Sequence, residues 1–157
     1  MPDDHASLIR NFQIEADFVD AVPYGCGHIN DTYAVTVNQG GAPLRYILQR
    51  INHAIFKDVP SLMENIGRVL DHLGGRLRED ASGSPRPTRA TRHALRLIPA
   101  RDGGNYYRDQ AGNYWRTYVF IEHAQTYNQV SSPELARQAA AAFGRFQQLV
   151  ADLDQPR

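Results

Sequence analysis

The sequence predicts an α+β domain with an antiparallel sheet of about five strands, one helix packed on that sheet, and further helices at its N-terminal and C-terminal ends. Three observations support this. Short runs rich in β-branched and aromatic residues recur along the chain. Most of them are separated by tight turns signalled by Gly, Asn and Asp, and tight turns join antiparallel neighbours. Two longer segments instead carry apolar residues at helical spacing.

Composition limits the class of protein. A chain of 157 residues with 42% hydrophobic content is long enough for one domain with a real core. Its formal net charge is zero, which argues against nucleic acid or an anionic membrane surface as a partner. The single cysteine excludes an internal disulfide and a cysteine-based metal cage. No signal peptide and no apolar run of about 20 residues is evident, so we expect a soluble cytoplasmic protein.

The first half of the chain predicts a helix, a hairpin and a longer helix. Residues 5–13 have the spacing of a short amphipathic helix, and residues 18–23 of a first strand. Residues 32–37 and 44–51 read as two strands joined by the turn Asn-Gln-Gly-Gly, and so as a hairpin. A helix is expected over residues 58–73, with Ser61 and Glu64 at capping-box spacing and a Gly-Gly pair at its end.

The second half predicts a loop, three strands and a last helix. Residues 79–92 lack periodicity and are expected to form a loop. Residues 94–99, 105–108 and 114–122 read as a three-stranded meander. The last helix is expected over residues 132–150, with Ser131 and Glu134 at capping-box spacing. Its predicted buried face is formed by Leu135, Ala139, Ala142, Phe143, Phe146, Leu149 and Val150.

A glycine segment between the first two strands is the first candidate for chemistry. Backbone amides approach phosphate oxygens closely only where side chains are absent, and Gly25 and Gly27 meet that condition. By itself a Gly-x-Gly pair is more often an ordinary turn. A strand rather than a helix follows it, which argues against a dinucleotide-binding fold, and no Gly-Lys-Ser/Thr is present for a Walker loop.

The neighbouring strings strengthen the case. Residues 27–33 read Gly-His-Ile-Asn-Asp-Thr-Tyr, residues 46–52 read Tyr-Ile-Leu-Gln-Arg-Ile-Asn, and residues 115–122 read Trp-Arg-Thr-Tyr-Val-Phe-Ile-Glu. Together they resemble the N-acetylhexosamine 1-kinases of the aminoglycoside phosphotransferase and choline kinase group, which have a protein-kinase-like fold. The resemblance covers most of the chain. It implies phosphorylation of the anomeric hydroxyl of N-acetylglucosamine or N-acetylgalactosamine, with ATP and Mg²⁺ as cofactors.

The resemblance also implies a division of labour. Residues 1–124 would be the ATP-binding small lobe, and residues 125–157 the hinge and first helix toward a C-terminal lobe. That further lobe would supply the catalytic base, the Mg²⁺ ligands and most of the sugar specificity. We therefore expect no catalytic residue within this sequence and no turnover by this chain alone.

For the phosphate loop, the resemblance points to residues 25–31. Gly25 and Gly27 would cover the phosphates. His28, Asn30 and Asp31 would hold the loop in shape or face the sugar. The simpler interpretation is that these polar side chains form turn-stabilising hydrogen bonds.

The strand cation and its helix partner are less regular. Kinases place a Lys on the third strand to neutralise phosphates; here the alignment puts Gln49 at that position, and Arg50 follows. Successive strand residues face opposite sides, so only one of them can face the phosphates. Charge favours Arg50, although it could equally be a surface arginine paired with a carboxylate. Glu64 is a candidate ion-pair partner for that cation, or else the capping partner of Ser61.

The aromatic strand resembles a kinase hinge. Phe120 would sit at the back of the adenine pocket, and Glu122, His123 and Ala124 would offer backbone groups to the base. A buried strand of an antiparallel sheet would satisfy the same pattern.

A second hypothesis comes from another class of protein: a non-catalytic kinase-like module that binds a partner or self-associates through an exposed lobe interface. No His and carboxylate cluster at metal-ligand spacing occurs, so no protein-ligated zinc is expected.

Overall fold

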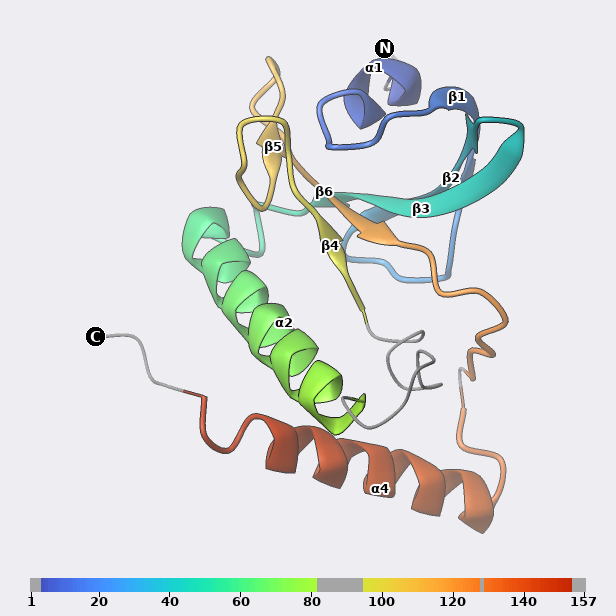
Figure 1. The fold of residues 1–157 in the computed structure, drawn as a ribbon, viewed down its shortest axis with the longest axis vertical. Helices are drawn as coiled ribbons and strands as arrows, with labels where there is room; N and C mark the ends of the chain where they lie inside the picture. The colour runs from blue at the N-terminus through green and yellow to red at the C-terminus, as the bar shows by residue number, and fades with distance from the viewer. Residues whose placement is uncertain (1–3, 82–94, 128, 154–157) are drawn as a thin grey trace. The chain divides into compact units, whose positions relative to one another are not determined.

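A computed structural model describes residues 4–81, 95–127 and 129–153 (Figure 1). The described part is α+β, with an open antiparallel sheet and three helices. In chain order the elements are α1 (His5–Ile9), β1 (Asp17–Pro23), β2 (Asp31–Gln39), β3 (Ala42–Ile51), α2 (Val59–Ala81), β4 (Leu97–Ile98), β5 (Tyr107–Arg108), β6 (Tyr114–Val119) and α4 (Pro133–Leu149). The loop expected over residues 79–92 lies largely outside the described residues.

The sheet has the strand order β1-β2-β3-β6-β4, with β5 also paired to β6. The predicted meander of the last three strands is therefore wrong. β4 and β5 share one edge of β6: β4 pairs with Thr117 and Tyr118, and β5 pairs with Tyr114 and Trp115. Between them the chain makes a turn, closed by a hydrogen bond from Ala100 N to Gly104 O, and β4 and β5 each pair with β6 rather than with each other.

The hairpin turn between β2 and β3 fixes which side chains share a face. Gly40 and Gly41 have φ values of 60° and 91°, which glycine adopts without steric cost. Gly41 N donates to Asn38 Oδ1 at 2.8 Å and closes the turn. The register that follows places Thr32 opposite Gln49, without a bulge along β2 and β3. β3 pairs with β6 in the same regular way.

Strand alternation gives the sheet two faces, which we call the α1 face and the α2 face after the helices that pack on them. On the α1 face, Val35, Val37, Leu48 and Trp115 are buried in one cluster with residues of α1 and the segment after it. On the α2 face, Ile51 at the end of β3 is buried with Val59 and Met63 of α2 in a second cluster. The sheet is thus the middle layer of a three-layer unit.

The helix α2 begins at Val59, one residue after the predicted start, but its cap and its end differ from the prediction. Its N-terminal cap is Asp58, whose carboxylate accepts from Ser61 N at 3.1 Å and from Ser61 Oγ at 2.7 Å, so the expected capping box of Ser61 and Glu64 is wrong. The helix also continues beyond the Gly-Gly pair to Ala81. Glycine costs about 1 kcal/mol relative to Ala in a helix but does not break it. Here contacts of His72 and Arg76 with Asp152 hold that stretch.

The last helix, α4, is capped by Ser132, whose hydroxyl accepts from Leu135 N at 3.2 Å. The expected cap at Ser131 is one residue early. The predicted buried face of α4 is also wrong, since the helix has no buried residue and Phe143 and Phe146 are 64% and 41% exposed. Helical spacing identifies an apolar stripe, but the stripe is buried only when another element covers it.

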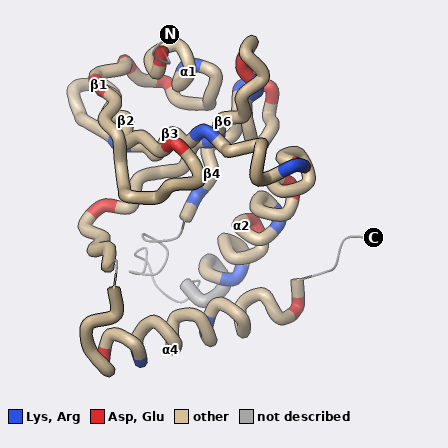
Figure 2. The backbone as a smooth tube through the Cα atoms, turned by 180° about the vertical axis from the view of Figure 1, so that it is seen from behind, with Lys and Arg blue, Asp and Glu red and all other residues tan. Residues whose placement is uncertain are grey.

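The chain divides into two compact units. The sheet unit comprises Met1–Gly67 and Leu95–Phe120, and the helical unit comprises Arg68–Ala94 and Ile121–Arg157. The division falls within α2. Both signs of charge occur along α2 and along α4 (Figure 2). Within the described residues, no helix is sufficiently long and apolar to cross a membrane.

Candidate phosphate-binding site

The glycine loop, residues 24–30, connects β1 to β2 in the sheet unit. Residues 24–29 are all exposed. Gly25 has φ of 82°, a left-handed conformation that favours glycine. At Gly27 an added Cβ would meet no atom within 4 Å. The loop is therefore an accessible turn whose backbone a ligand could approach closely.

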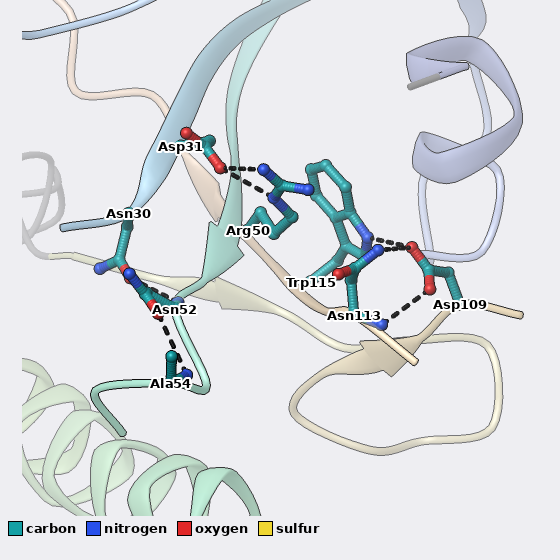
Figure 3. Close-up of polar contacts among 8 residues, drawn as sticks. All are labelled: Asn30, Asp31, Arg50, Asn52, Ala54, Asp109, Asn113 and Trp115. Carbon is teal, nitrogen blue, oxygen red and sulfur yellow. Dashed lines mark hydrogen bonds and ion pairs between the residues drawn. The ribbon is translucent and has the colours of Figure 1, made fainter. Parts of the chain in front are cut away.

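Two side-chain contacts fix the end of this loop to β3 (Figure 3). Asn30 Oδ1 accepts a hydrogen bond from Asn52 N at 2.9 Å, just beyond the end of β3. Asp31 Oδ2 accepts from Arg50 Nε at 2.8 Å and forms an ion pair with Arg50 Nη2 at 2.5 Å. Asn30 and Asp31 thus have the loop-stabilising contacts that their residue types allow, while His28 is exposed in the loop.

The contact between Arg50 and Asp31 also determines where Arg50 lies. In the register of β3 and β6, Arg50 is opposite Trp115, which is buried on the α1 face. Gln49, its neighbour in sequence, therefore lies on the α2 face. The two candidates for the strand cation thus occupy opposite faces of the sheet.

On the α2 face, a row of three polar side chains crosses β2, β3 and β6. Gln49 Nε2 donates to Thr32 Oγ1 at 2.7 Å. Gln49 Oε1 accepts from Arg116 at 2.6 Å to Nη2 and 2.9 Å to Nε. Neighbouring strands are about 4.8 Å apart, so the row carries the guanidinium to within about 10 Å of the strand that leaves the glycine loop.

Arg116 is a cation that the sequence reasoning missed. Its guanidinium is half-buried, lies 3.6 Å from Met63 Sδ through Nη1 and has its Cζ 5.3 Å from the centre of the Tyr118 ring. Burial lowers the pKa of Arg116, and the nearby Tyr118 phenol opposes that change. Among the described residues it has no carboxylate within ion-pair distance. Strand alternation in the sequence places Arg116 on the same face of β6 as Tyr114 and Tyr118, but only the register of β3 with β6 sets it beside Gln49.

Glu64 does not join this group. It is exposed on α2, the helix cap is Asp58 rather than the predicted pair with Ser61, and no ion pair between Glu64 and the described part of β3 is present.

The end of β6 meets the start of the glycine loop. The rings of Tyr24 and Phe120 are in edge contact, with centroids 5.3 Å apart. The guanidinium of Arg45 lies over the Phe120 ring, 3.9 Å from its centre. By strand alternation, Phe120 shares the α2 face with Arg116 and Tyr118. The α2 face thus carries the contact between Phe120 and Tyr24, the first residue of the glycine loop, together with the half-buried guanidinium of Arg116.

The remaining hinge candidates belong to the helical unit. Glu122, His123 and Ala124 are exposed. His123 has φ of 58°, the only positive value for a non-glycine residue in the described part of the chain. A side chain in this conformation costs roughly 1 kcal/mol or more, so the backbone here is held in an unusual turn.

Across residues 4–81, 95–127 and 129–153, no group of three or more His, Cys, Asp or Glu side chains could hold a metal ion. No protein-family model matches the chain.

Proposed function

We propose that this chain is the ATP-binding small lobe of a sugar kinase. The observation that carries the proposal is the convergence of three features on the α2 face of the sheet unit. The exposed glycine loop starts at Tyr24, whose ring packs against Phe120, and Arg116 lies in the row that begins at Thr32, close after the end of the loop. A nucleotide requires the same three features, since it has a flexible phosphate chain, a flat base and negative charge.

In this proposal the loop backbone covers the phosphates, and Gly25 and Gly27 allow the amides to approach the oxygens. The exposed apolar side chains beside the loop would take the base: Val22 is 49% exposed and Tyr24 is 43% exposed, and the Tyr24 ring contacts that of Phe120. Phosphoryl transfer depends mainly on positioning and on electrostatic stabilisation of the transferring group. The lobe supplies part of both.

The sugar part of the proposal rests on the resemblance of residues 27–33, 46–52 and 115–122 to the N-acetylhexosamine 1-kinases. Mg²⁺ would reach the site with ATP, and the base and metal ligands would come from a C-terminal lobe. We therefore expect no phosphorylation of N-acetylglucosamine by residues 1–157 alone. Steady ATP-dependent phosphorylation by this chain would contradict that division of labour.

A titration of the chain with ATP and Mg²⁺, followed by ¹⁵N amide NMR, tests the nucleotide part. The expected result is a saturable shift of the Gly25 and Gly27 amides together with signals around Phe120. Adenosine should shift the Phe120 region and leave the glycine amides in place, because it lacks phosphates. If no saturable shift occurs at ATP concentrations up to about 10 mM, the proposal is overturned.

The exposed stripe of α4 favours one other candidate, a non-catalytic module that self-associates. Phe143 and Phe146 lie next to each other, with ring centroids 6.3 Å apart, and both are exposed. Exposed apolar patches of this kind often mark interaction surfaces. Light scattering after size exclusion tests this candidate: self-association that is lost in a Phe143→Ser, Phe146→Ser double variant would support it, and a clean monomer across the concentration range would count against it.

A further inference from the structure

Arg116 differs from Arg50 and Arg101 of the sheet unit because, among the described residues, no carboxylate lies within ion-pair distance of its guanidinium. Arg50 is paired with Asp31, and Arg101 is paired with Glu15 at 3.2 Å. The partners of Arg116 are instead an amide oxygen, a thioether sulfur and an aromatic ring. A half-buried cation without a counter-anion is costly, and a bound anion offsets that cost.

The hydrogen-bond inventory supports this. A guanidinium has five N–H donors arranged in a fork that matches phosphate geometry. Gln49 takes one donor from Nε and one from Nη2, and Met63 takes one from Nη1. One N–H on each terminal nitrogen therefore has no acceptor among the described residues. These two donors, one on each terminal nitrogen, are available to an oxyanion.

Gln49 holds the guanidinium in place. Its amide donates to Thr32 on one side and accepts from Arg116 on the other, which fixes the orientation of the amide. An amide positions the cation without neutralising it, whereas a Glu at the same place would do both. The choice of Gln at residue 49 thus leaves the positive charge available to a ligand.

We propose that Arg116, positioned by Gln49, is an oxyanion site for a phosphate chain on the α2 face of the sheet. The inference rests on the proposed function, because the phosphate chain would belong to a nucleotide. It goes further by assigning the phosphate-binding charge to β6 rather than to Gln49 or Arg50 of β3.

The test uses inorganic tripolyphosphate, ADP and adenosine, all without metal, with the full chain and its variants. Binding is followed through the Arg Nε–H signals by NMR. Arg116→Met should lower the affinity for tripolyphosphate and for ADP about tenfold, equivalent to about 1.4 kcal/mol, and leave the affinity for adenosine unchanged. Arg108→Met is the matched control, because its guanidinium also lies 5.3 Å from a ring of β6, that of Tyr114, but it is exposed.

Gln49→Glu separates a binding role from a structural one. It should raise the melting temperature, because the new carboxylate pairs with Arg116. It should also lower the affinity for tripolyphosphate as much as Arg116→Met does. A stabilised variant with unchanged anion affinity would overturn the inference. So would equal affinities of Arg116→Met and Arg108→Met, or the absence of tripolyphosphate binding to the wild type.

The ligand series distinguishes this failure from failure of the proposed function. If ADP binds and its affinity is the same in Arg116→Met as in the wild type, the nucleotide proposal is retained and the oxyanion site is overturned. Arg116-dependent binding of tripolyphosphate, with ADP no tighter and adenosine not bound, retains the oxyanion site and overturns the nucleotide proposal.

Discussion

Gln49 and Arg50 are adjacent in β3, yet Gln49 hydrogen-bonds to Arg116 on the α2 face while Arg50 is paired with Asp31 on the α1 face. Arg50, which has the charge, therefore lies on the opposite face of the sheet from Gln49, which occupies the position of the kinase lysine in the resemblance. Arg116, on the neighbouring strand, places a cation beside Gln49 on the α2 face.

The pair of Arg50 and Asp31 is exposed, with side chains 37% and 52% accessible. Exposed pairs contribute at most about 1 kcal/mol. Arg50→Met should lower the free energy of unfolding by less than that, and it should leave the ratio of ADP to adenosine affinity unchanged. Urea unfolding and the same ligand titrations check both parts. A lost preference for ADP would assign the phosphate-binding charge to Arg50 instead.

Asn30 anchors the loop through its contact with the backbone of Asn52. Asn30→Ala should lower the free energy of unfolding by about 1 kcal/mol, because a partly buried N–H loses its acceptor. Asn30→Asp keeps an acceptor oxygen and is the control. Amide hydrogen exchange at Asn52 is the local measurement: its rate should rise in the Ala variant and remain near wild type in the Asp variant.

The two glycines of the loop should respond differently to Ala. Gly25→Ala should cost about 1–2 kcal/mol because its φ of 82° is strained for a side chain. Gly27→Ala should be nearly neutral, since an added Cβ there meets nothing within 4 Å.

A larger side chain at Gly27 would project from an exposed turn and obstruct the approach of a ligand to the loop backbone. Gly27→Val should therefore reduce ATP affinity while the melting temperature stays within a few degrees of wild type. Thermal unfolding and ATP titration of Gly25→Ala, Gly27→Ala and Gly27→Val check this series. Unchanged ATP affinity in Gly27→Val would exclude close approach of a ligand at that residue.

Asp109 accepts hydrogen bonds from Trp115 and Asn113 (Figure 3), and these bonds make the stability of the sheet unit depend on pH. Burial raises the pKa of Asp109, but hydrogen bonds from the Trp115 indole, at 2.8 Å, and from Asn113 outweigh it and leave that pKa below its usual value. A carboxyl whose pKa is lower in the folded state stabilises the fold above about pH 4, the value for an unfolded Asp. That contribution is lost as the pH falls through the lower, folded pKa.

Asp109→Asn should therefore be less stable than wild type at pH 6, with a difference that narrows at pH 3. Trp115 is the one tryptophan of the chain, so its fluorescence reports urea unfolding at both pH values. Asp102→Asn, in an exposed turn, is the control. A stability difference that is the same at both pH values would contradict the role of the Asp109 charge.

The strands could be predicted from the sequence because their side chains alternate and their turns carry Gly and Asn. The turn at Asn38 to Gly41 fixes the hairpin register locally, so the faces of β2 and β3 follow from the sequence. The shared edge of β6 could not be predicted, because it depends on a turn near Ala100 that bridges to Phe12.

Part of the candidate site also depends on long-range pairing. Arg116 is 67 residues from Gln49 in the chain, and the register of β3 with β6 brings them together. Helical spacing likewise indicated an apolar stripe on α4 but not what covers it, since Phe143 is 64% exposed. Local patterns thus identified the elements, and pairing between distant strands identified the cation.

The central claim is that the glycine loop and the α2 face bind a nucleoside triphosphate. Paramagnetic relaxation with Mn²⁺·ATP tests it most directly. The metal follows the phosphates and broadens NMR signals close to it. We predict selective broadening of the Gly25 and Gly27 amides and of the Arg116 Nε–H signal, reversed by excess ADP. Broadening confined to other parts of the chain, or none at saturating Mn²⁺·ATP, would contradict the claim.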